Sequence, residues 1–320
     1  MKKIYTLLFA LLLAVGVLAG CGETQKNDNT ADNNASTEKA SFPVTIKDAL
    51  GEDVVIDKDP EKIVSLIPSN TEIAFELGLG KELVGVSDYD NYPAETAKIE
   101  KVGGMEFNVE KIISLKPDVV LAHASSAHNS KEGLQQLRDA GIDVLVVNDA
   151  TNFEGVYDSI EMIGKATGET KEAGQLITEM KNKLADIKEK AAKIADNEKK
   201  SVYVEISGEP SIYSTGKNTF MQEMLDTINA TNVVIEEGWI QVDQEAIIKA
   251  NPDVIITTYG SYATEDPAET ISKRKGWKDI TAVKNKAVVD VDSDTVSRSG
   301  PRLVKGVEEF AKAVYPDVFK

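Results

Sequence analysis

Short apolar runs alternate with longer amphipathic segments along most of this chain. The apolar runs are rich in Val and Ile and are bounded by Gly, Pro, Asn or Asp, which is typical of buried strands. We expect strands at residues 62–67, 83–87, 119–122, 144–147, 202–206, 254–258 and 287–290, preceded by a hairpin over 42–56. Between them, apolar positions recur every three to four residues, which predicts helices at 73–78, 109–115, 131–140, 157–167, 219–228, 245–249 and 301–314. Strands that alternate with helices predict parallel sheets and an α/β fold.

One polar segment, residues 170–200, differs from the rest by its length and its single apolar stripe. The stripe residues are spaced three or four positions apart: Leu176, Met180, Leu184, Ile187 and Ala191. Lys and Glu occupy the other faces, so the pattern predicts one amphipathic helix that packs along a surface. About 28 helical residues at 1.5 Å each span on the order of 40 Å, which is long enough to join two domains.

The same motif stands on both sides of this segment. Residues 110–121 read EKIISLKPDVVL and residues 245–256 read EAIIKANPDVII, with Glu, Ile-Ile, Pro-Asp and an aliphatic strand at the same offsets. Two copies are too few and too distant for a solenoid, whose repeats are about 20–50 residues long. We therefore expect two Rossmann-like α/β lobes, residues 42–169 and 201–320, joined by a single long helix over 170–200, with a ligand cleft between them.

The loops that follow the strands carry the candidate binding residues, because ligands of open parallel sheets bind beyond the carboxyl ends of the strands. Aromatic side chains occur in these loops although only 6% of the chain is aromatic, and two of the four arginines, Arg298 and Arg302, share one of them. Tyr89 and Trp239 are flanked by polar residues, so we expect both rings to be exposed. Aromatic faces with a few polar anchors suit a bulky ligand held between two lobes.

The amino terminus has the pattern of an export signal. Lys2 and Lys3 precede an apolar segment over residues 4–18, which is shorter than the about 20 residues that span a membrane. The segment is followed by Ala-Gly-Cys in a pattern that resembles the bacterial lipobox, and Cys21 is the only cysteine of the chain. We expect a signal peptide at residues 1–20, then a lipidated Cys21 with a disordered polar tether through residue 41. The protein would be anchored by lipid on the extracytoplasmic face of the cell membrane.

Charge and histidine content argue against several other classes of function. The net charge of −17 disfavours nucleic acid as a partner. His123 and His128 are the only histidines and lie five positions apart, whereas helical zinc pairs lie four apart beside a carboxylate, so we expect no protein metal site. No G-x-S-x-G nucleophile elbow is present, and we expect a binding protein rather than an enzyme. A surface hydrolase that uses His123 with a loop serine or carboxylate is the alternative from another class.

Glu110 and Glu245 open the two copies of the repeated motif. A carboxylate in the first turn of a helix is favoured by the helix dipole, and this alone explains each residue. Their recurrence at equivalent positions of the two halves permits a second interpretation, in which a matched pair of carboxylates docks a partner with two-fold symmetry.

These features together resemble the cluster III substrate-binding proteins of ABC importers, which serve cobalamin, ferric siderophores and haem. The resemblance covers residues 63–314 and is strongest for the cobalamin-binding proteins. The segments that carry it are 65–75, 85–93, 98–102, 115–118, 239–245 and 293–302. It implies that Tyr89 and Trp239 sandwich a corrin and that Asp294 and Arg298 are polar anchors in the cleft. It also implies that the two repeated glutamates form salt bridges with arginines on two permease subunits.

The sequence departs from the cobalamin-binding pattern in the expected aromatic wall. His123 and the region of Met105 stand where that pattern has tryptophans, so both are candidate ligand contacts that could also face a haem iron. The resemblance implies a monomeric extracytoplasmic lipoprotein without a cofactor of its own, which binds cobalamin and delivers it to an ABC permease dimer with its ATPase. A ferric siderophore or haem, each also a metal-containing small molecule, is the alternative ligand.

Overall fold

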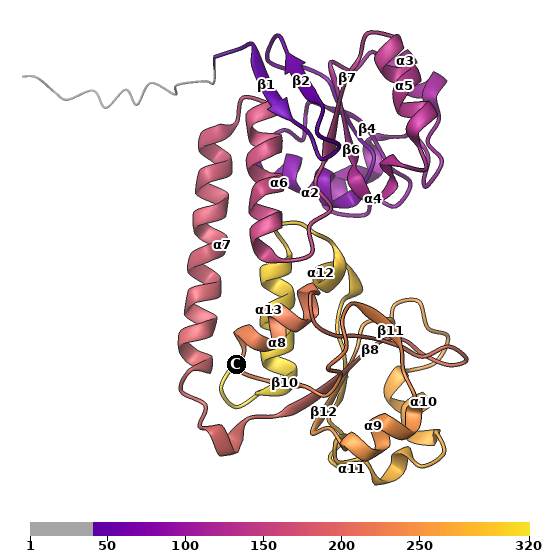
Figure 1. Cartoon of the computed structure of the whole chain (residues 1–320), viewed down its shortest axis with the longest axis vertical. Coiled ribbons are helices and arrows are strands. Elements are labelled where there is room, and N and C mark those ends of the chain that lie inside the picture. Colours follow the sequence, from indigo (N-terminus) through magenta and orange to yellow (C-terminus); the bar gives the residue numbers. More distant parts are fainter. Residues whose placement is uncertain (1–40) are drawn as a thin grey trace, which may run out of the picture. The chain divides into compact units, whose positions relative to one another are not determined.

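The structure, a computed structural model, describes residues 41–320 as an amino-terminal lobe (N-lobe) and a carboxyl-terminal lobe (C-lobe) joined by helix α7 (Thr170–Ala191), as Figure 1 shows. The predicted signal peptide, Cys21 and all but the last residue of the predicted tether lie outside the described residues. None of the described helices is long and apolar enough to cross a membrane.

The N-lobe contains a five-stranded parallel sheet in the order β5-β4-β3-β6-β7. Its strands are β3 (Ile63–Ser65), β4 (Leu83–Val86), β5 (Glu100–Lys101), β6 (Val119–His123) and β7 (Asp143–Val147). Its helices are α2 (Pro68–Glu76), the 3-10 helix η1 (Ala94–Lys98), α3 (Val109–Leu115), α4 (Ala124–Ala127), α5 (Lys131–Asp139) and α6 (Phe153–Ala166). Successive strand residues point to opposite faces, so Ile63 joins the core beside α2 and α6 while Val64 joins a separate core beside α3 and α5. Both faces of the sheet are therefore covered.

The predicted hairpin is present at the start of the N-lobe. Strands β1 (Val44–Lys47) and β2 (Asp53–Ile56) pair antiparallel in a two-stranded sheet. Gly51 lies in the turn with φ of 82°, a conformation that residues with a side chain rarely adopt.

The C-lobe contains a mixed sheet in the order β11-β9-β8-β12-β13, with β10 also paired to β8. Its strands are β8 (Ser201–Ser207), β9 (Tyr213–Thr215), β10 (Thr231–Asn232), β11 (Trp239–Gln241), β12 (Val254–Thr257) and β13 (Val288–Asp290). Its helices are η2 (Asp196–Glu198), α8 (Phe220–Thr227), α9 (Gln244–Ala250), α10 (Pro267–Lys273), η3 (Trp277–Asp279), α11 (Thr281–Lys284), α12 (Ser293–Ser297) and α13 (Leu303–Val314).

The expectation of a wholly parallel sheet is wrong for the C-lobe. Strand β9 pairs antiparallel with both β8 and β11. Only residues 208–212 separate β8 from β9, and a connection this short permits a hairpin but not the crossover that parallel strands need. Strands β9 and β11 have only three residues each and contain polar residues, so they lack the long apolar run that marks a strand in a sequence.

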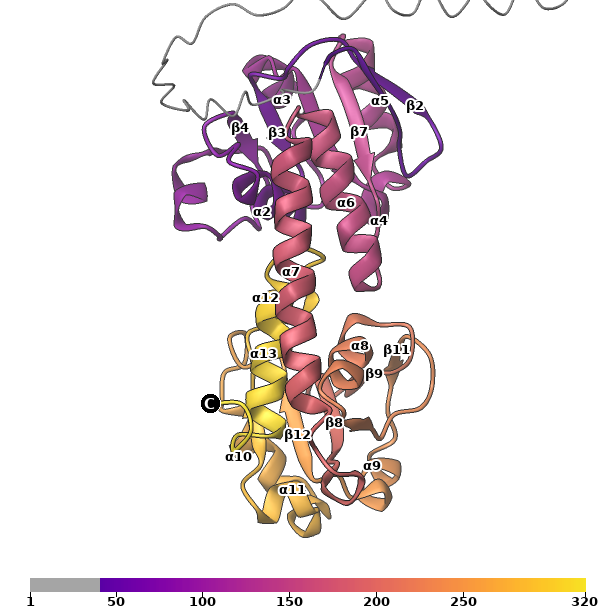
Figure 2. The ribbon, with the colours of Figure 1, turned by 90° about the vertical axis from the view of Figure 1, so that its left-hand side faces the viewer.

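Helix α7 lies beside α6 of the N-lobe and beside α8 and α13 of the C-lobe (Figure 2). It is shorter than predicted, because it ends at Ala191 rather than near residue 200. The chain turns there so that Ile194 reaches the core, and the Asn229 amide donates to the carbonyl oxygens of Ala191 and Ile194. Met180 and Ile187 of the predicted stripe are buried, and Leu184 is half-buried.

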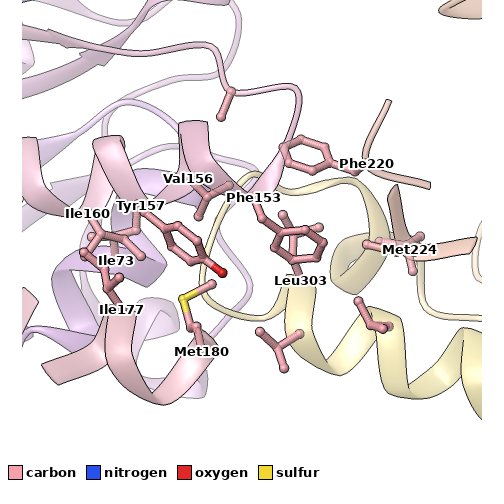
Figure 3. Packing of buried hydrophobic residues seen from close by; sticks show 14 of the residues in the cluster. Ile73, Phe153, Val156, Tyr157, Ile160, Ile177, Met180, Phe220, Met224 and Leu303 are labelled. Carbon is pink, nitrogen blue, oxygen red and sulfur yellow. The ribbon is translucent and has the colours of Figure 1, made fainter. Parts of the chain in front are cut away.

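One apolar core continues from the N-lobe through α7 into the C-lobe (Figure 3). The rings of Phe153 at the start of α6 and Phe220 at the start of α8 meet edge to face, with centroids 6.4 Å apart and planes at 77°. The Phe153 amide also donates to Glu223 Oε2 of α8 at 2.8 Å. Burial raises the pKa of this carboxyl, although the hydrogen bond opposes the shift. The lobes are thus joined by packed side chains as well as by α7, which opposes a large change in their relative orientation.

Candidate ligand cleft and docking helices

The repeated Pro-Asp motif has the same structural role in both lobes. The Asp118 carboxylate accepts hydrogen bonds from the amides of Glu61 and Lys62, the two residues that precede β3. Asp253 accepts in the same way from the Ser201 amide at the start of β8. Each aspartate therefore ties the strand that follows it to the neighbouring parallel strand, which explains why the motif recurs with its strand.

The pKa of Asp118 reflects this position. Burial alone would raise it, but the hydrogen bond and charge of Lys58, at 2.7 Å, and the two backbone amides outweigh that effect and lower the pKa below its usual value. The ionised carboxylate consequently stabilises the folded N-lobe at neutral pH.

Helices α3 and α9, which begin the two repeats, have nearly identical ends. Asn108 caps α3 and Asp243 caps α9 through side-chain oxygens that accept from backbone amides in the first turn. Each helix closes with a residue in the left-handed conformation before the Pro-Asp pair, Lys116 with φ of 54° and Asn251 with φ of 49°.

Glu110 and Glu245 lie in the first turns of these two helices, and both are exposed. Among the residues that the structure describes, neither carboxylate forms an ion pair or a side-chain hydrogen bond. Their role in docking remains a prediction, and the geometry leaves both oxygens of each carboxylate available to a partner.

Tyr89 lies in a rigid loop at the carboxyl edge of the N-lobe sheet, and its side chain is 55% exposed. Ser87 Oγ donates to Asp90 Oδ2 at 2.6 Å, and Lys101 Nζ donates to the carbonyl oxygens of both residues. A Cβ at Gly104 would lie 2.9 Å from the Tyr89 hydroxyl oxygen, so this ring position depends on a glycine there. Burial raises the pKa of Asp90, against the opposing effect of these hydrogen bonds. The loop presents Tyr89 as an exposed and preorganised ring.

Arg298 and Asp294, predicted as ligand anchors, are engaged with each other and with the N-lobe. Arg298 Nη2 lies 2.9 Å from Asp294 Oδ2, and Arg298 Nη1 donates to Glu72 Oε1 at 2.9 Å. Asn91 completes the contact, since its Oδ1 accepts from Arg298 at 2.7 Å and its amide donates to Asp294. Both predicted anchors therefore contact the loop that carries Tyr89, and whether they also touch a ligand remains a prediction.

Glu72 is the centre of this contact and was not predicted from the sequence. It is 1% exposed in α2, and its carboxylate also accepts two hydrogen bonds from Arg302, at 2.9 and 2.7 Å. The Arg302 guanidinium stacks on the Tyr92 ring at 4.1 Å. In the sequence, Glu72 follows Ser69, Asn70 and Thr71, so it has the appearance of an ordinary solvated glutamate. One buried carboxylate thus pairs with two arginines of the opposite lobe, and Asp294 supplies a second negative charge beside Arg298.

The C-lobe edge holds a different buried ion pair. Arg274 forms a double hydrogen bond with Glu205, with both N–O distances 2.7 Å, and the two side chains are 2% and 0% exposed. The Tyr259 hydroxyl donates to the same carboxylate at 2.5 Å, and Arg274 stacks on Trp277 at 4.7 Å. Burial raises the pKa of Tyr259, and the charge of Glu205 raises it further. The phenol therefore stays protonated and fixes the loop after β12.

His123 and Met105 differ in exposure. Met105 is 69% exposed near the Tyr89 loop, whereas His123, at the carboxyl end of β6, is 4% exposed. His123 Nδ1 accepts from the Ser125 amide, so the neutral ring carries its proton on Nε2, which has no hydrogen-bond partner among the described residues. Burial lowers the pKa of His123, with opposing contributions from Asp149 and the Asn148 backbone. Contact of either residue with a ligand remains a prediction.

Trp239 lies in β11 and lines a cavity bordered by both lobes. Its side chain is 52% exposed, as expected from the sequence, although the residue belongs to a strand rather than a loop. The cavity has a volume of about 190 Å³. Its lining residues come from one N-lobe loop and three C-lobe segments: Asp149, Ala150, Thr151, Asn218, Thr219, Phe220, Trp239, Ser297 and Ser299. Within residues 41–320, no group of three or more His, Cys, Asp and Glu side chains is arranged to hold a metal ion.

Comparison with known proteins identifies the class. The chain belongs to the periplasmic binding protein family, whose model matches residues 63–295. A Bacillus subtilis (strain 168) protein described as an uncharacterized ABC transporter substrate-binding lipoprotein is 54% identical over 321 residues, with both chains covered in full. A cobalamin-binding protein from Halobacterium salinarum is 28% identical over 319 residues, or 97% of this chain and 84% of that one.

A solved structure agrees with this assignment. The crystal structure of a possible iron-binding, periplasmic solute-binding protein from Staphylococcus epidermidis ATCC 12228 matches with a TM-score of 0.73 and 39% identity, covering 81% of this chain and all of that one. The protein described here is an ABC-transporter substrate-binding protein of the cobalamin, haem and siderophore family. It is a binding protein rather than an enzyme, and its partners are a permease and an ATPase.

Proposed function

We propose that this protein binds a corrinoid, with cobalamin as the first candidate, and delivers it to an ABC permease. The observation that carries the proposal is the pair of exposed rings, Tyr89 from the N-lobe and Trp239 from the C-lobe, each more than half exposed. Exposed aromatic faces are suited to a broad planar ligand, because stacking buries a large area on each ring. The similarity to a cobalamin-binding relative supports the same ligand class.

Delivery requires a docking surface, which we assign to Glu110 and Glu245. Both carboxylates are exposed in the first turns of matched helices, and opposite charges across an interface accelerate and orient association. We also propose that Cys21 is lipidated and anchors a monomer on the extracytoplasmic face of the membrane. The lipoprotein description of the Bacillus subtilis relative supports the anchor.

A ferric complex is the second candidate ligand. It is favoured by the similarity to the Staphylococcus epidermidis protein described as possibly iron-binding, and by the exposed thioether of Met105. The ligand would then be a siderophore complex or haem rather than a corrinoid.

Calorimetric titration tests the proposal. The protein without residues 1–21 is titrated with cyanocobalamin, haemin and a neutral ferric hydroxamate in parallel. We expect submicromolar binding of cyanocobalamin. Binding of an iron complex alone would replace the corrinoid proposal with the second candidate, and recovery of each ligand unaltered would distinguish a receptor from a hydrolase.

A further inference from the structure

The cavity beside Trp239 has a chemical character of its own. Asp149, Thr151, Asn218 and Ser299 supply polar groups to it, and none of these four side chains forms a hydrogen bond or ion pair with the described residues. Asp149 interacts through its charge with His123, which is neutral at neutral pH because burial lowers its pKa. The cavity therefore offers a carboxylate, an amide and hydroxyl groups that are not bonded to other described side chains and can bind a ligand in place of solvent.

No lysine or arginine is among the residues that line this cavity. The nearest arginine along the chain, Arg298, lies between two lining serines but is held by Glu72 and Asp294, and Arg302 is held by Glu72. Lys217 precedes the lining residue Asn218 but does not line the cavity itself. A carboxylate or phosphate of a ligand would find no cationic partner here and would meet the charge of Asp149, so an anionic group is disfavoured.

The size of the cavity sets what can enter it. About 190 Å³ corresponds to roughly six water molecules at about 30 Å³ each, which is too small for a corrin or porphyrin ring but sufficient for a short side arm. The lining residue Phe220 is held in place, because its ring packs on Phe153 and the Phe153 amide donates a hydrogen bond to Glu223. Trp239 forms one wall, so an arm that enters the cavity belongs to a ligand whose body can stack on that ring.

We propose that this cavity is a subsite for a hydrogen-bond-donating arm of the ligand, a primary carboxamide or an ammonium group, with Asp149 as its acceptor. The inference rests on the proposed function, because it requires a ligand body between the lobes. It adds that the protein selects against ligands that present an anionic arm at this position. The peripheral amides of a corrinoid and the terminal amine of a linear hydroxamate siderophore supply the same N–H donors.

Two variants of opposite sign test the subsite. Asp149→Asn removes the carboxylate, and Asn218→Asp adds one to the cavity lining, at a position with φ of 60° that Asp tolerates as Asn does. Asp158→Asn, an exposed residue of α6 that does not line the cavity, is the matched charge control. Circular dichroism and thermal melting confirm that each variant folds.

The ligands are chosen in pairs that differ in one arm. The first pair is cyanocobalamin and its monocarboxylic acids, in which one peripheral amide is hydrolysed. The second is a ferric linear trihydroxamate with a terminal ammonium and its N-acetyl derivative. We expect one acid isomer to bind at least about tenfold more weakly than cyanocobalamin, or the acetylated complex to bind at least about tenfold more weakly than the amine. The first result identifies an amide arm and the second an ammonium arm.

The variants should shift these ratios in opposite directions. Asp149→Asn should weaken binding of the ligand with the N–H donor arm and strengthen binding of the corresponding acid. Asn218→Asp should weaken binding of the acid and strengthen binding of the ligand with the ammonium arm. If cyanocobalamin or the iron complex binds but both variants behave like Asp158→Asn, the subsite is wrong while the proposed function stands. If no corrinoid and no iron complex binds the wild-type protein, the proposed function fails and the subsite fails with it.

Discussion

The two lobes have matched helices, α3 and α9, at the start of the repeated motif. They differ in the side chains at the carboxyl edges of their sheets. Helices α3 and α9 share their caps, their left-handed ends and an exposed first-turn glutamate. The strand register, continued by one residue, places Leu66 in the N-lobe where the C-lobe has Glu205, whose carboxylate is buried against Arg274. Matched features suit a partner that has two equivalent subunits, and unlike edges suit a ligand that has no such symmetry.

Charge reversal at the matched helices should produce the largest effect. Glu110→Lys and Glu245→Lys together should abolish ligand uptake by whole cells while leaving the calorimetric ligand affinity unchanged, because the residues act on the permease and not on the ligand. Each single variant should impair uptake to a similar extent. Glu132→Lys with Glu269→Lys, at exposed first-turn glutamates of α5 and α10, is the control. Normal import by the first double variant would reduce both residues to helix-dipole partners.

Breaking the buried pair of the C-lobe edge should give the next largest effect. Glu205→Ala leaves Arg274 charged and unpaired in a site where its side chain is 2% exposed, and should lower the free energy of unfolding by about 3–5 kcal/mol. Urea denaturation measures the change. Replacing both partners by leucine should recover much of the loss, since no buried charge then remains. Equal destabilisation by the single and the double variant would show that the pair matters for packing rather than for charge.

The two exposed rings should contribute to ligand binding. Trp239→Ala should weaken binding of the titrated ligand by about 1–3 kcal/mol, the range expected for losing a large stacked contact. Tyr89→Ala tests the ring of the other lobe in the same way. Leu50→Ala removes a comparably exposed apolar side chain, 51% exposed, from the β1–β2 turn and should leave affinity unchanged. Wild-type affinity in Trp239→Ala would remove that residue from the site.

Substitution of a duplicated aspartate should have the smallest of these effects. Asp118→Asn should cost about 1–2 kcal/mol of stability at neutral pH, because its carboxylate is bonded to Lys58 and two amides. Its folded-state pKa is lowered, so the stabilisation is present above the unfolded-state pKa and is lost as the pH falls through the folded-state value. Urea midpoints of wild type and variant should therefore converge on acidification. A constant difference down to pH 3 would contradict the assignment.

Much of the architecture was accessible from the sequence because its signals are local. Apolar runs located the central strands, the repeated motif indicated two lobes, and the stripe containing Met180 and Ile187 indicated α7. The exposure of Tyr89 and Trp239 also followed from their polar neighbours. Each of these signals is contained in one short segment of the chain, and the repeat requires only the comparison of two twelve-residue segments.

The parts that escaped prediction depend on distant residues. Glu72 meets Arg298 and Arg302 across more than 220 positions of the chain, and no local pattern marks one glutamate as their shared partner. The burial of His123 likewise depends on packing rather than on its polar surroundings in sequence. Strands β9 and β11 are stabilised by pairing with each other and with β8, which short polar segments do not reveal.

The apolar core that passes from α6 through α7 to α8 and α13 has a consequence for how the molecule melts. Since the cluster draws side chains from both lobes, neither lobe can unfold without exposing apolar surface that the other lobe covers. The two lobes, although each carries one copy of the repeated motif, should therefore unfold in a single cooperative transition, with equal calorimetric and van't Hoff enthalpies. Damage to either lobe is then felt as a lower melting temperature of the whole protein.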